Sequence, residues 1–315
     1  MAETIVPAAA PPSGRRRPLL GYGMVAVAAI LFGINGSVSK VIIRAGLATD
    51  RLTEIRCTGA VIGLALIAAL TRPDELRVSW RELLFLAAFG LGVTLVQWMY
   101  FVAIGRLHVG VVLLIQYVAP LLVALWARLV YREDVRRRIW ASLALSLTGL
   151  VLIVRLWNGL TLDGVGLLAA LGSMVTFAAY VLMAERAVRS RGSVSVLAWG
   201  FLVATLFWTI VVPWWGFPAD TVAATTSLLG RLGGVHLPVA ALVAWVIVIG
   251  TIVPFILIIG ALRHVSATRV GIVAMLEPVT GTLVAWTWLG EALSAVQLAG
   301  AAVVLVGIAI AQTAR

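Results

Sequence analysis

The segment from Met275 to Leu293, MLEPVTGTLVAWTWLGEAL, places two carboxylates and a proline within an otherwise apolar stretch. Glu277 stands directly before Pro278, and Glu291 follows 14 residues later. A proline removes a helix N–H and disfavours helical geometry at the residue before it, so backbone carbonyls near Glu277 are left free. A carboxylate beside free carbonyls can bind an ammonium group or carry a proton, which makes this segment the first candidate site.

Helical spacing brings further polar residues to such a site. Thr280 lies three residues after Glu277 and therefore shares its helix face. Gln116 and Tyr117 precede another proline, and for them cavity lining and helix–helix hydrogen bonding are both open interpretations. For Trp98 the alternative is the aromatic belt at the membrane surface. The candidate substrate-binding residues of a central cavity are Glu277, Asn35, Gln97, Trp98, Gln116, Tyr117, Tyr180 and Thr280.

Two basic residues lie near the outer ends of their apolar stretches. Lys40 and Arg56 either extend to the lipid headgroups or line an outer vestibule that attracts anionic groups. Prolines inside apolar stretches predict bends, and a bend can serve as a gate. The candidate bending residues are Pro120, Pro278 and Pro254.

The whole chain has the composition of a membrane protein. It has 315 residues, of which 62% are hydrophobic and 12% charged, whereas a soluble domain has about 25% charged residues. Apolar stretches of about 20 residues recur, the length that crosses a bilayer as a helix. A β-barrel would instead show alternating segments of about ten residues. The sequence therefore predicts an all-α polytopic membrane protein.

The charged and metal-binding residue types exclude several other classes. The net charge of +11 comes from arginines spread between the apolar stretches, so it does not indicate nucleic-acid binding. The single cysteine, Cys57, allows no internal disulfide. The three histidines stand near predicted helix ends and form no cluster with cysteines or carboxylates, so we expect no metal site and no cofactor.

Ten membrane spans and their orientation follow from apolar stretches and arginine counting. With the N-terminus inside, inner segments hold 16 arginines and outer segments hold 5, which is a strong positive-inside bias. We therefore expect a multi-pass protein of the inner cell membrane with both termini cytoplasmic, and residues 1–18, rich in Ala and Pro, as a disordered cytoplasmic tail. The predicted spans are 20–43, 52–70, 83–103, 108–130, 137–155, 164–184, 195–215, 239–260, 266–288 and 292–312. The connection 216–238 is predicted to be a surface loop.

The chain contains an internal repeat. The segment that starts at Ala103 aligns without a gap over 47 residues with the segment that starts at Ala261, an offset of 158. The matched pairs include Pro120 with Pro278, Glu133 with Glu291, and Gly149 with Gly307. Each half, 19–155 and 163–312, then holds five spans. Because five is odd, the halves should cross the membrane in opposite directions, as ten transmembrane helices in two inverted five-helix repeats.

The repeat also offers a role for Glu133 and Glu291. Each carboxylate follows one span and precedes the next. We expect both to accept the unpaired N–H groups of a first helical turn and to face the positive end of the helix dipole. They are therefore predicted to be structural.

These segments resemble the EamA-type permeases of the drug/metabolite transporter superfamily. The most specific piece is LEPVTGTLVAWTWLGEALSAVQLAGAAVVLVGIAI, from Leu276 to Ile310. LFGINGSVSK is similar to the first-span motif of that family, with Phe32 where Trp is common, and EIRCTGAVIG to its second-span pattern, with Arg56 in the arginine place. In the first half, Arg132 replaces the glycine that usually precedes the glutamate. The resemblance, over about residues 20–312, implies carrier activity, often export of amino acids, other metabolites or toxic compounds.

We therefore expect a secondary transporter that exports small metabolites by alternating access. Its substrates would be amino acids or related compounds, and could include drugs. We expect it to bind a small-molecule substrate and to lie in the lipid bilayer, and we expect no binding of nucleic acid. The sequence is compatible with a monomer and with a homodimer. The alternatives are a non-transporting scaffold or receptor, and an intramembrane enzyme. No Walker motif and no HExxH motif is present in the sequence, which argues against ATP drive and zinc proteolysis.

Overall fold

The computed structural model describes residues 17–313 apart from 105, 108, 133 and 156–162. In this part of the chain ten helical stretches are long and apolar enough to cross a membrane, so the prediction of an all-α polytopic membrane protein is confirmed. Residues 1–16 of the predicted tail lie outside the described residues. The first helix begins at Pro18. Glu133, for which a helix-starting role was predicted, also lies outside the described residues.

Seven spans are continuous helices and three are interrupted. The continuous helices are α1 Pro18–Arg44, α2 Thr49–Thr71, α3 Trp80–Ile104, α6 Arg137–Val154, α7 Gly164–Ala187, α8 Ser193–Val211 and α14 Ala295–Thr313. The interrupted spans are α4 Val109–Gln116 with α5 Ala119–Leu129, α10 Val239–Ile247 with the π-helix η4 Val248–Ile252 and α11 Val253–Ala261, and α12 Ala267–Ala274 with α13 Leu276–Val284 and the π-helix η5 Ala285–Leu289. The shorter elements are η1 Pro73–Leu76, η2 Trp214–Gly216, α9 Ala219–Ala223, β1 Thr225–Ser227, η3 Gly230–Leu232 and β2 His236–Pro238.

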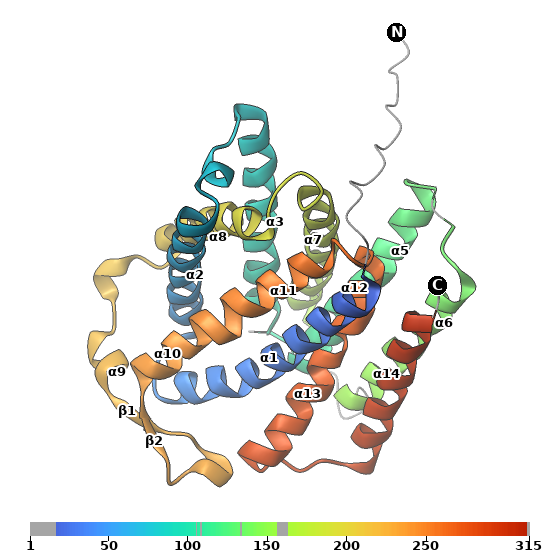
Figure 1. Cartoon of the computed structure of the whole chain (residues 1–315). Helices are drawn as coiled ribbons and strands as arrows, with labels where there is room; N and C mark the ends of the chain where they lie inside the picture. The colour runs from blue at the N-terminus through green and yellow to red at the C-terminus, as the bar shows by residue number, and fades with distance from the viewer. Residues whose placement is uncertain (1–16, 105, 108, 133, 156–162, 314–315) are drawn as a thin grey trace.

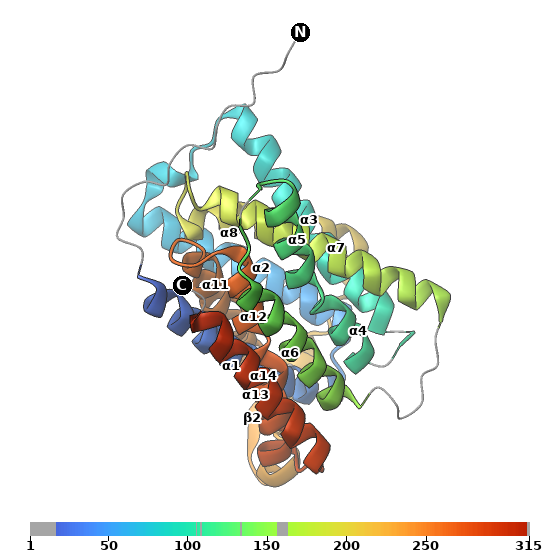
Figure 2. The same ribbon diagram turned by 90° about the vertical axis from the view of Figure 1, so that its right-hand side faces the viewer.

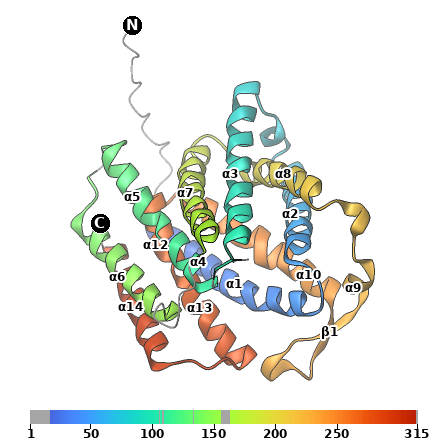
Figure 3. The ribbon, with the colours of Figure 1, turned by 180° about the vertical axis from the view of Figure 1, so that it is seen from behind.

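Each half of the chain packs mainly against the other half. Helix α6 lies along α14, and α2 lies against α8. Helix α1 contacts α11 and α13, while α3 contacts α7 and α8. Figures 1 and 2 show α6 and α14 side by side at one edge of the bundle, and Figure 3 shows α2, α3 and α8 together at the other. In each of these pairs one helix belongs to the first repeat and the other to the second. That the two repeats cross the membrane in opposite directions stays a prediction.

The α6–α14 contact depends on glycines at a close backbone approach. A Cβ on Gly149 would stand 2.6 Å from the Gly300 carbonyl oxygen, and one on Gly307 would stand 3.0 Å from the Ser142 carbonyl oxygen. Ser142 donates its hydroxyl to the Gly307 carbonyl at 2.6 Å. Gly149 and Gly307 are 158 residues apart, and so are Ser142 and Gly300, so exchanging the halves converts one contact into the other. Small residues of this kind let helices in lipid pack closely.

Two of the interrupted spans break at the same register. Helix α4 ends at Gln116 and α12 ends at Ala274, again 158 residues apart. The next helices carry Pro120 and Pro278 within their first turns, where a missing N–H costs nothing. The proline therefore begins a new half-helix in each repeat. In the third interrupted span Pro254 is the second residue of α11, which directly follows the π-helix η4.

The connection 216–238, predicted as a surface loop, contains a small hairpin. Strands β1 and β2 pair antiparallel, with Thr226 opposite Leu237. The Trp288 indole N–H donates to the Leu228 carbonyl at 3.0 Å, which attaches the hairpin to the end of η5. Leu228 also packs with buried residues of α1 and α10. We call this end of the bundle the hairpin end, and the end at which α11 stops and α12 begins the opposite end.

The predicted helix-starting role of Glu291 is wrong. Helix α14 begins four residues later, at Ala295, and is capped by Ser294 and Gln297, which bond each other's backbone N–H reciprocally. Glu291 is instead paired with Lys40, whose ammonium lies 2.5 Å from its Oε1. The pair joins α1 to the α13–α14 connection at the hairpin end.

Candidate functional site

The breaks of the two matched spans meet in the middle of the bundle. Tyr117 lies in the turn between α4 and α5, and Glu277 is the second residue of α13. The Tyr117 hydroxyl donates to Glu277 Oε2 at 2.8 Å. Pro120 packs against Gly271 of α12, where a Cβ would stand 2.7 Å from its ring, so the two broken spans are in direct contact. The structure thus brings together two predicted site residues, one from each repeat.

A second pair lies on α2 and α3. The Arg56 guanidinium donates through Nη2 to Gln97 Oε1 at 2.7 Å. The buried Cys57 thiol stands 3.9 Å from the same oxygen. Arg56 is seven residues from the start of α2 and Gln97 seven from the end of α3, so both lie about 10 Å inside the hairpin end. Arg56 was predicted either to extend to the headgroups or to line an outer vestibule, and its bond to Gln97 directs the guanidinium toward α3.

Tyr100 was not among the predicted site residues. It is half-buried on α3, three residues after Gln97 and on the same face. The sequence contained a signal for it, because Gln97 and Tyr100 have helical spacing.

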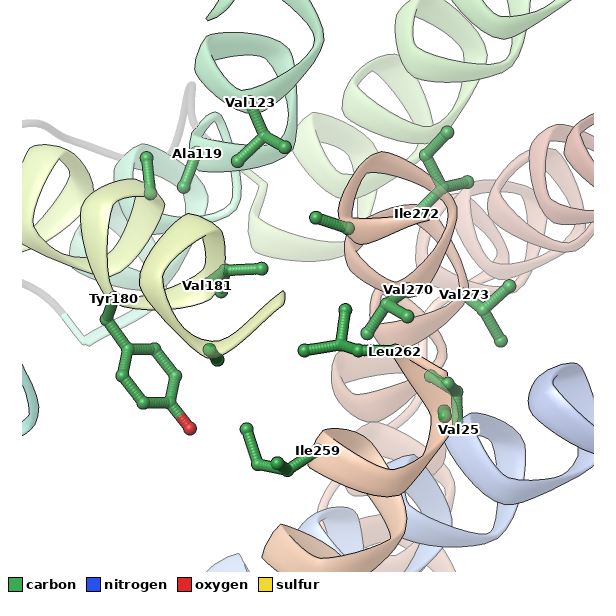
Figure 4. Close-up of a cluster of buried hydrophobic side chains, with 14 of the residues drawn as sticks. Val25, Ala119, Val123, Tyr180, Val181, Ile259, Leu262, Val270, Ile272 and Val273 are labelled. Carbon is green, nitrogen blue, oxygen red and sulfur yellow. The ribbon is translucent and has the colours of Figure 1, made fainter. Parts of the chain in front are cut away.

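Aliphatic side chains fill the bundle on the other side of the breaks. Val123 of α5, Val181 of α7, Leu262 at the end of α11 and Val270 of α12 are buried in one cluster. Figure 4 shows these side chains converging from their helices, with Ala119 beside them. The polar groups therefore lie on the hairpin side of the breaks, and apolar packing separates them from the opposite end.

Gln116 and Thr280 make helix–helix contacts. Gln116 donates to the Ser173 hydroxyl at 3.4 Å, and Ser173 donates to the Val96 carbonyl at 3.2 Å, which links α4, α7 and α3. Thr280 bonds carbonyls of its own helix and, at 3.2 Å, the Ala29 carbonyl of α1. For both residues the structure supports the packing interpretation.

Three further candidates form no hydrogen bond with Tyr117 or Glu277 in the described residues, although Tyr180 belongs to the same buried cluster as Tyr117. Asn35 is buried against Gly250 of η4, and its Oδ1 has no hydrogen-bond partner. Tyr180 stacks on Phe89 with ring centroids 5.2 Å apart, and its hydroxyl is also unpartnered. Trp98 is 44% exposed and contacts Phe207 of α8.

A cavity of about 320 Å³ lies near the opposite end. Residues of α1, α2, α8 and α11 line it, including Arg72, Arg263 and His264. Neither Glu277 nor Arg56 contributes to its lining. In the described part of the chain no group of three or more His, Cys, Asp or Glu residues could hold a metal ion.

Comparison with known proteins places this geometry in context. The sequence matches the EamA-like transporter family over residues 19–155 and 164–313. It is 25% identical over 238 residues to the threonine/homoserine exporter RhtA of Salmonella typhimurium strain SL1344, covering 75% of this chain and 74% of that protein. RhtA of Escherichia coli K12 is 26% identical over the same share of each chain. The uncharacterized transporter YwfM of Bacillus subtilis strain 168 is 25% identical over 92% of this chain and 93% of its own.

A crystal structure supports the fold. It superposes with a TM-score of 0.71 at 20% identity and covers 95% of this chain and 98% of the solved one. The relatives are named as transporters or exporters, not as enzymes.

Proposed function

Because the chain belongs to the EamA-like transporter family, we propose that it is a secondary transporter that exports a small metabolite from the cytoplasm by alternating access. The relatives named threonine/homoserine exporters support export as the direction and amino acids or related compounds as substrates. The chain is a multi-pass membrane protein, and the arginine bias supports a cell-membrane location with both termini cytoplasmic. In this orientation the hairpin end faces outward.

The Tyr117–Glu277 bond is the observation that carries the proposal. A half-buried carboxylate in a membrane span is costly, and in this chain it is matched by a single hydroxyl donor. A substrate ammonium forms a stronger, charge-assisted hydrogen bond than a phenol does. The ammonium therefore replaces the Tyr117 hydroxyl on Glu277, and when the substrate leaves, a proton or the tyrosine takes its place.

The two repeats supply the moving parts. Tyr117 belongs to residues 19–155 and Glu277 to residues 163–312, so the site lies between the halves. When the halves rock, the aliphatic cluster around Val123 and Val270 opens toward the cytoplasmic cavity while the hairpin end closes. The Lys40–Glu291 pair and the hairpin lie where the outer closure forms. Each end then opens in turn to the same central groups.

Counterflow in proteoliposomes tests this proposal. Purified protein is reconstituted, loaded with unlabelled L-threonine or L-homoserine, and supplied with the labelled compound outside. We expect saturable exchange by the wild type, loss of exchange by Glu277→Gln, and unchanged exchange by Asp134→Asn, which removes an exposed carboxylate between α5 and α6. Absence of flux with a broad panel of amino acids, metabolites and drugs would indicate a non-transporting scaffold or receptor.

A further inference from the structure

Two arginines of α2 differ in how their guanidinium groups are satisfied. Arg51 is bonded to the buried Glu54 carboxylate. It also donates to the Val212 carbonyl at 3.3 Å and the Pro213 carbonyl at 2.8 Å at the end of α8. Arg51 thus has a carboxylate partner and two carbonyl partners, and these bonds join α2 to α8.

Arg56 has no such set of partners. Within the described part of the chain it makes one hydrogen bond, from Nη2 to Gln97, and its Nε is buried without a partner. A guanidinium has five donors, and a buried donor left unpaired is destabilising. No carboxylate of the described residues forms an ion pair with it within 4.0 Å. Arg56 therefore retains donors that can bind an anionic group.

The position of Arg56 relative to Glu277 indicates what that anionic group is. Two hydrogen bonds through Ser173 join Gln116 to the Val96 carbonyl, so Tyr117, which bonds Glu277, lies one residue from one end of this link, and Gln97, which bonds Arg56, lies one residue from the other. Glu277 is twelve residues from the end of η5, about 18 Å inside the hairpin end, whereas Arg56 is about 10 Å inside it. The site therefore has a negative group at its deeper end, bonded to Tyr117, and a positive group nearer the hairpin end, bonded to Gln97.

We propose that Arg56 binds the carboxylate of a zwitterionic substrate whose ammonium is bound by Glu277. This inference rests on the proposed function and narrows it to substrates that carry both charges. The planar fork of arginine matches a carboxylate with two parallel hydrogen bonds. Gln97 accepts a hydrogen bond from Nη2 and so orients the guanidinium group of Arg56. Gln97 is therefore a positioning residue, and Arg56 determines the specificity for the carboxylate. Amines that lack the carboxylate leave Arg56 unpaired and are poor substrates.

The test compares L-threonine with L-threoninamide, which keeps the ammonium and loses the carboxylate. In counterflow the wild type should prefer threonine by about tenfold or more, as expected for charge-assisted hydrogen bonds to one group. Arg56→Gln should raise KM for threonine by about tenfold and leave KM for threoninamide nearly unchanged, so that the preference disappears. Arg44→Gln, which removes an exposed arginine at the end of α1, should keep the preference.

Further variants and a binding assay separate the possible failures. Arg56→Lys keeps the charge without the fork and should give an intermediate preference, and it serves if Arg56→Gln does not fold. The shift in melting temperature of purified wild type with each compound reports the same preference without transport. Equal use of both compounds by the wild type, with Glu277→Gln inactive, would overturn the role of Arg56 and leave the proposed function standing. Failure of the wild type to move or bind any amino acid would overturn both.

Discussion

The two broken spans share one architecture and differ in chemistry. Spans α4–α5 and α12–α13 break 158 residues apart in the sequence, each just before a proline. In the second span the residue before the proline is Glu277, and in the first it is Ala119. Tyr117, which bonds Glu277, has Met275 as its counterpart, and Met275 is completely buried. Exchanging the halves therefore turns a polar bond into an apolar contact.

The α6–α14 pair shows the opposite behaviour. There the Gly149–Gly300 approach and the Gly307–Ser142 approach are equivalent under exchange, and both are close backbone contacts. The helix boundaries also match, since α6 begins at Arg137 and α14 at Ala295. The comparison teaches that the scaffold kept its symmetry where helices only pack, and lost it where the substrate is proposed to bind.

Moving the carboxylate between repeats should have the largest effect. The double variant Glu277→Ala with Ala119→Glu places the acid at the related position, beside the aliphatic cluster and away from Tyr117. We expect counterflow to fall at least about 100-fold, because a carboxylate that lacks its partner groups loses more than one charge-assisted bond. Recovery of exchange to the wild-type rate would show that the two breaks are interchangeable and would contradict the asymmetry.

Glycine substitution tests the symmetric part of the comparison. Gly149→Ala and Gly307→Ala should each lower the free energy of unfolding by about 1–3 kcal/mol, because each new Cβ meets backbone or a buried serine. The two losses should be similar. Gly23→Ala, on an open face of α1, should not destabilise the protein. Melting temperatures in detergent measure all three, and a loss in only one of the pair would show that the packing is not equivalent.

Removing the tyrosine hydroxyl should have the smallest effect. Tyr117→Phe deletes the donor to Glu277 but keeps the ring, so we expect a change in KM of about three- to tenfold, the worth of one hydrogen bond. Tyr131→Phe changes an exposed tyrosine two residues beyond the end of α5 and should leave KM unchanged. Initial rates of counterflow over a range of threonine concentrations distinguish the two, and equal values for both variants would remove Tyr117 from the site.

Much of the fold could be predicted from the sequence because its causes are local. Apolar length located the ten spans, and the observed helices follow the predicted ranges within a few residues. The prolines at 120 and 278 marked both breaks. The hairpin was missed because strands of three residues carry almost no periodic signal and are held by the Trp288–Leu228 contact from another helix.

Part of the candidate site could be proposed from the sequence. Glu277 was proposed because a carboxylate before a proline in an apolar span has few local explanations, and Tyr117 because the repeat pointed to the matching break. The hydrogen bonds between helices could not be predicted, because a helix turns about 100° per residue and its rotation is set by its neighbours and not by its own sequence. The Arg56–Gln97 bond between α2 and α3 is an example.

Substrate binding to Glu277 in the absence of transport is the most direct measurement of the central claim. Calorimetric titration of purified wild type, Asp134→Asn and Glu277→Gln with L-threonine compares affinity without any dependence on rocking of the repeats. We predict that wild type and Asp134→Asn bind with the same Kd, and that Glu277→Gln shows no saturable binding although it melts at the wild-type temperature. An unchanged Kd in Glu277→Gln would contradict the assignment of this carboxylate to the substrate.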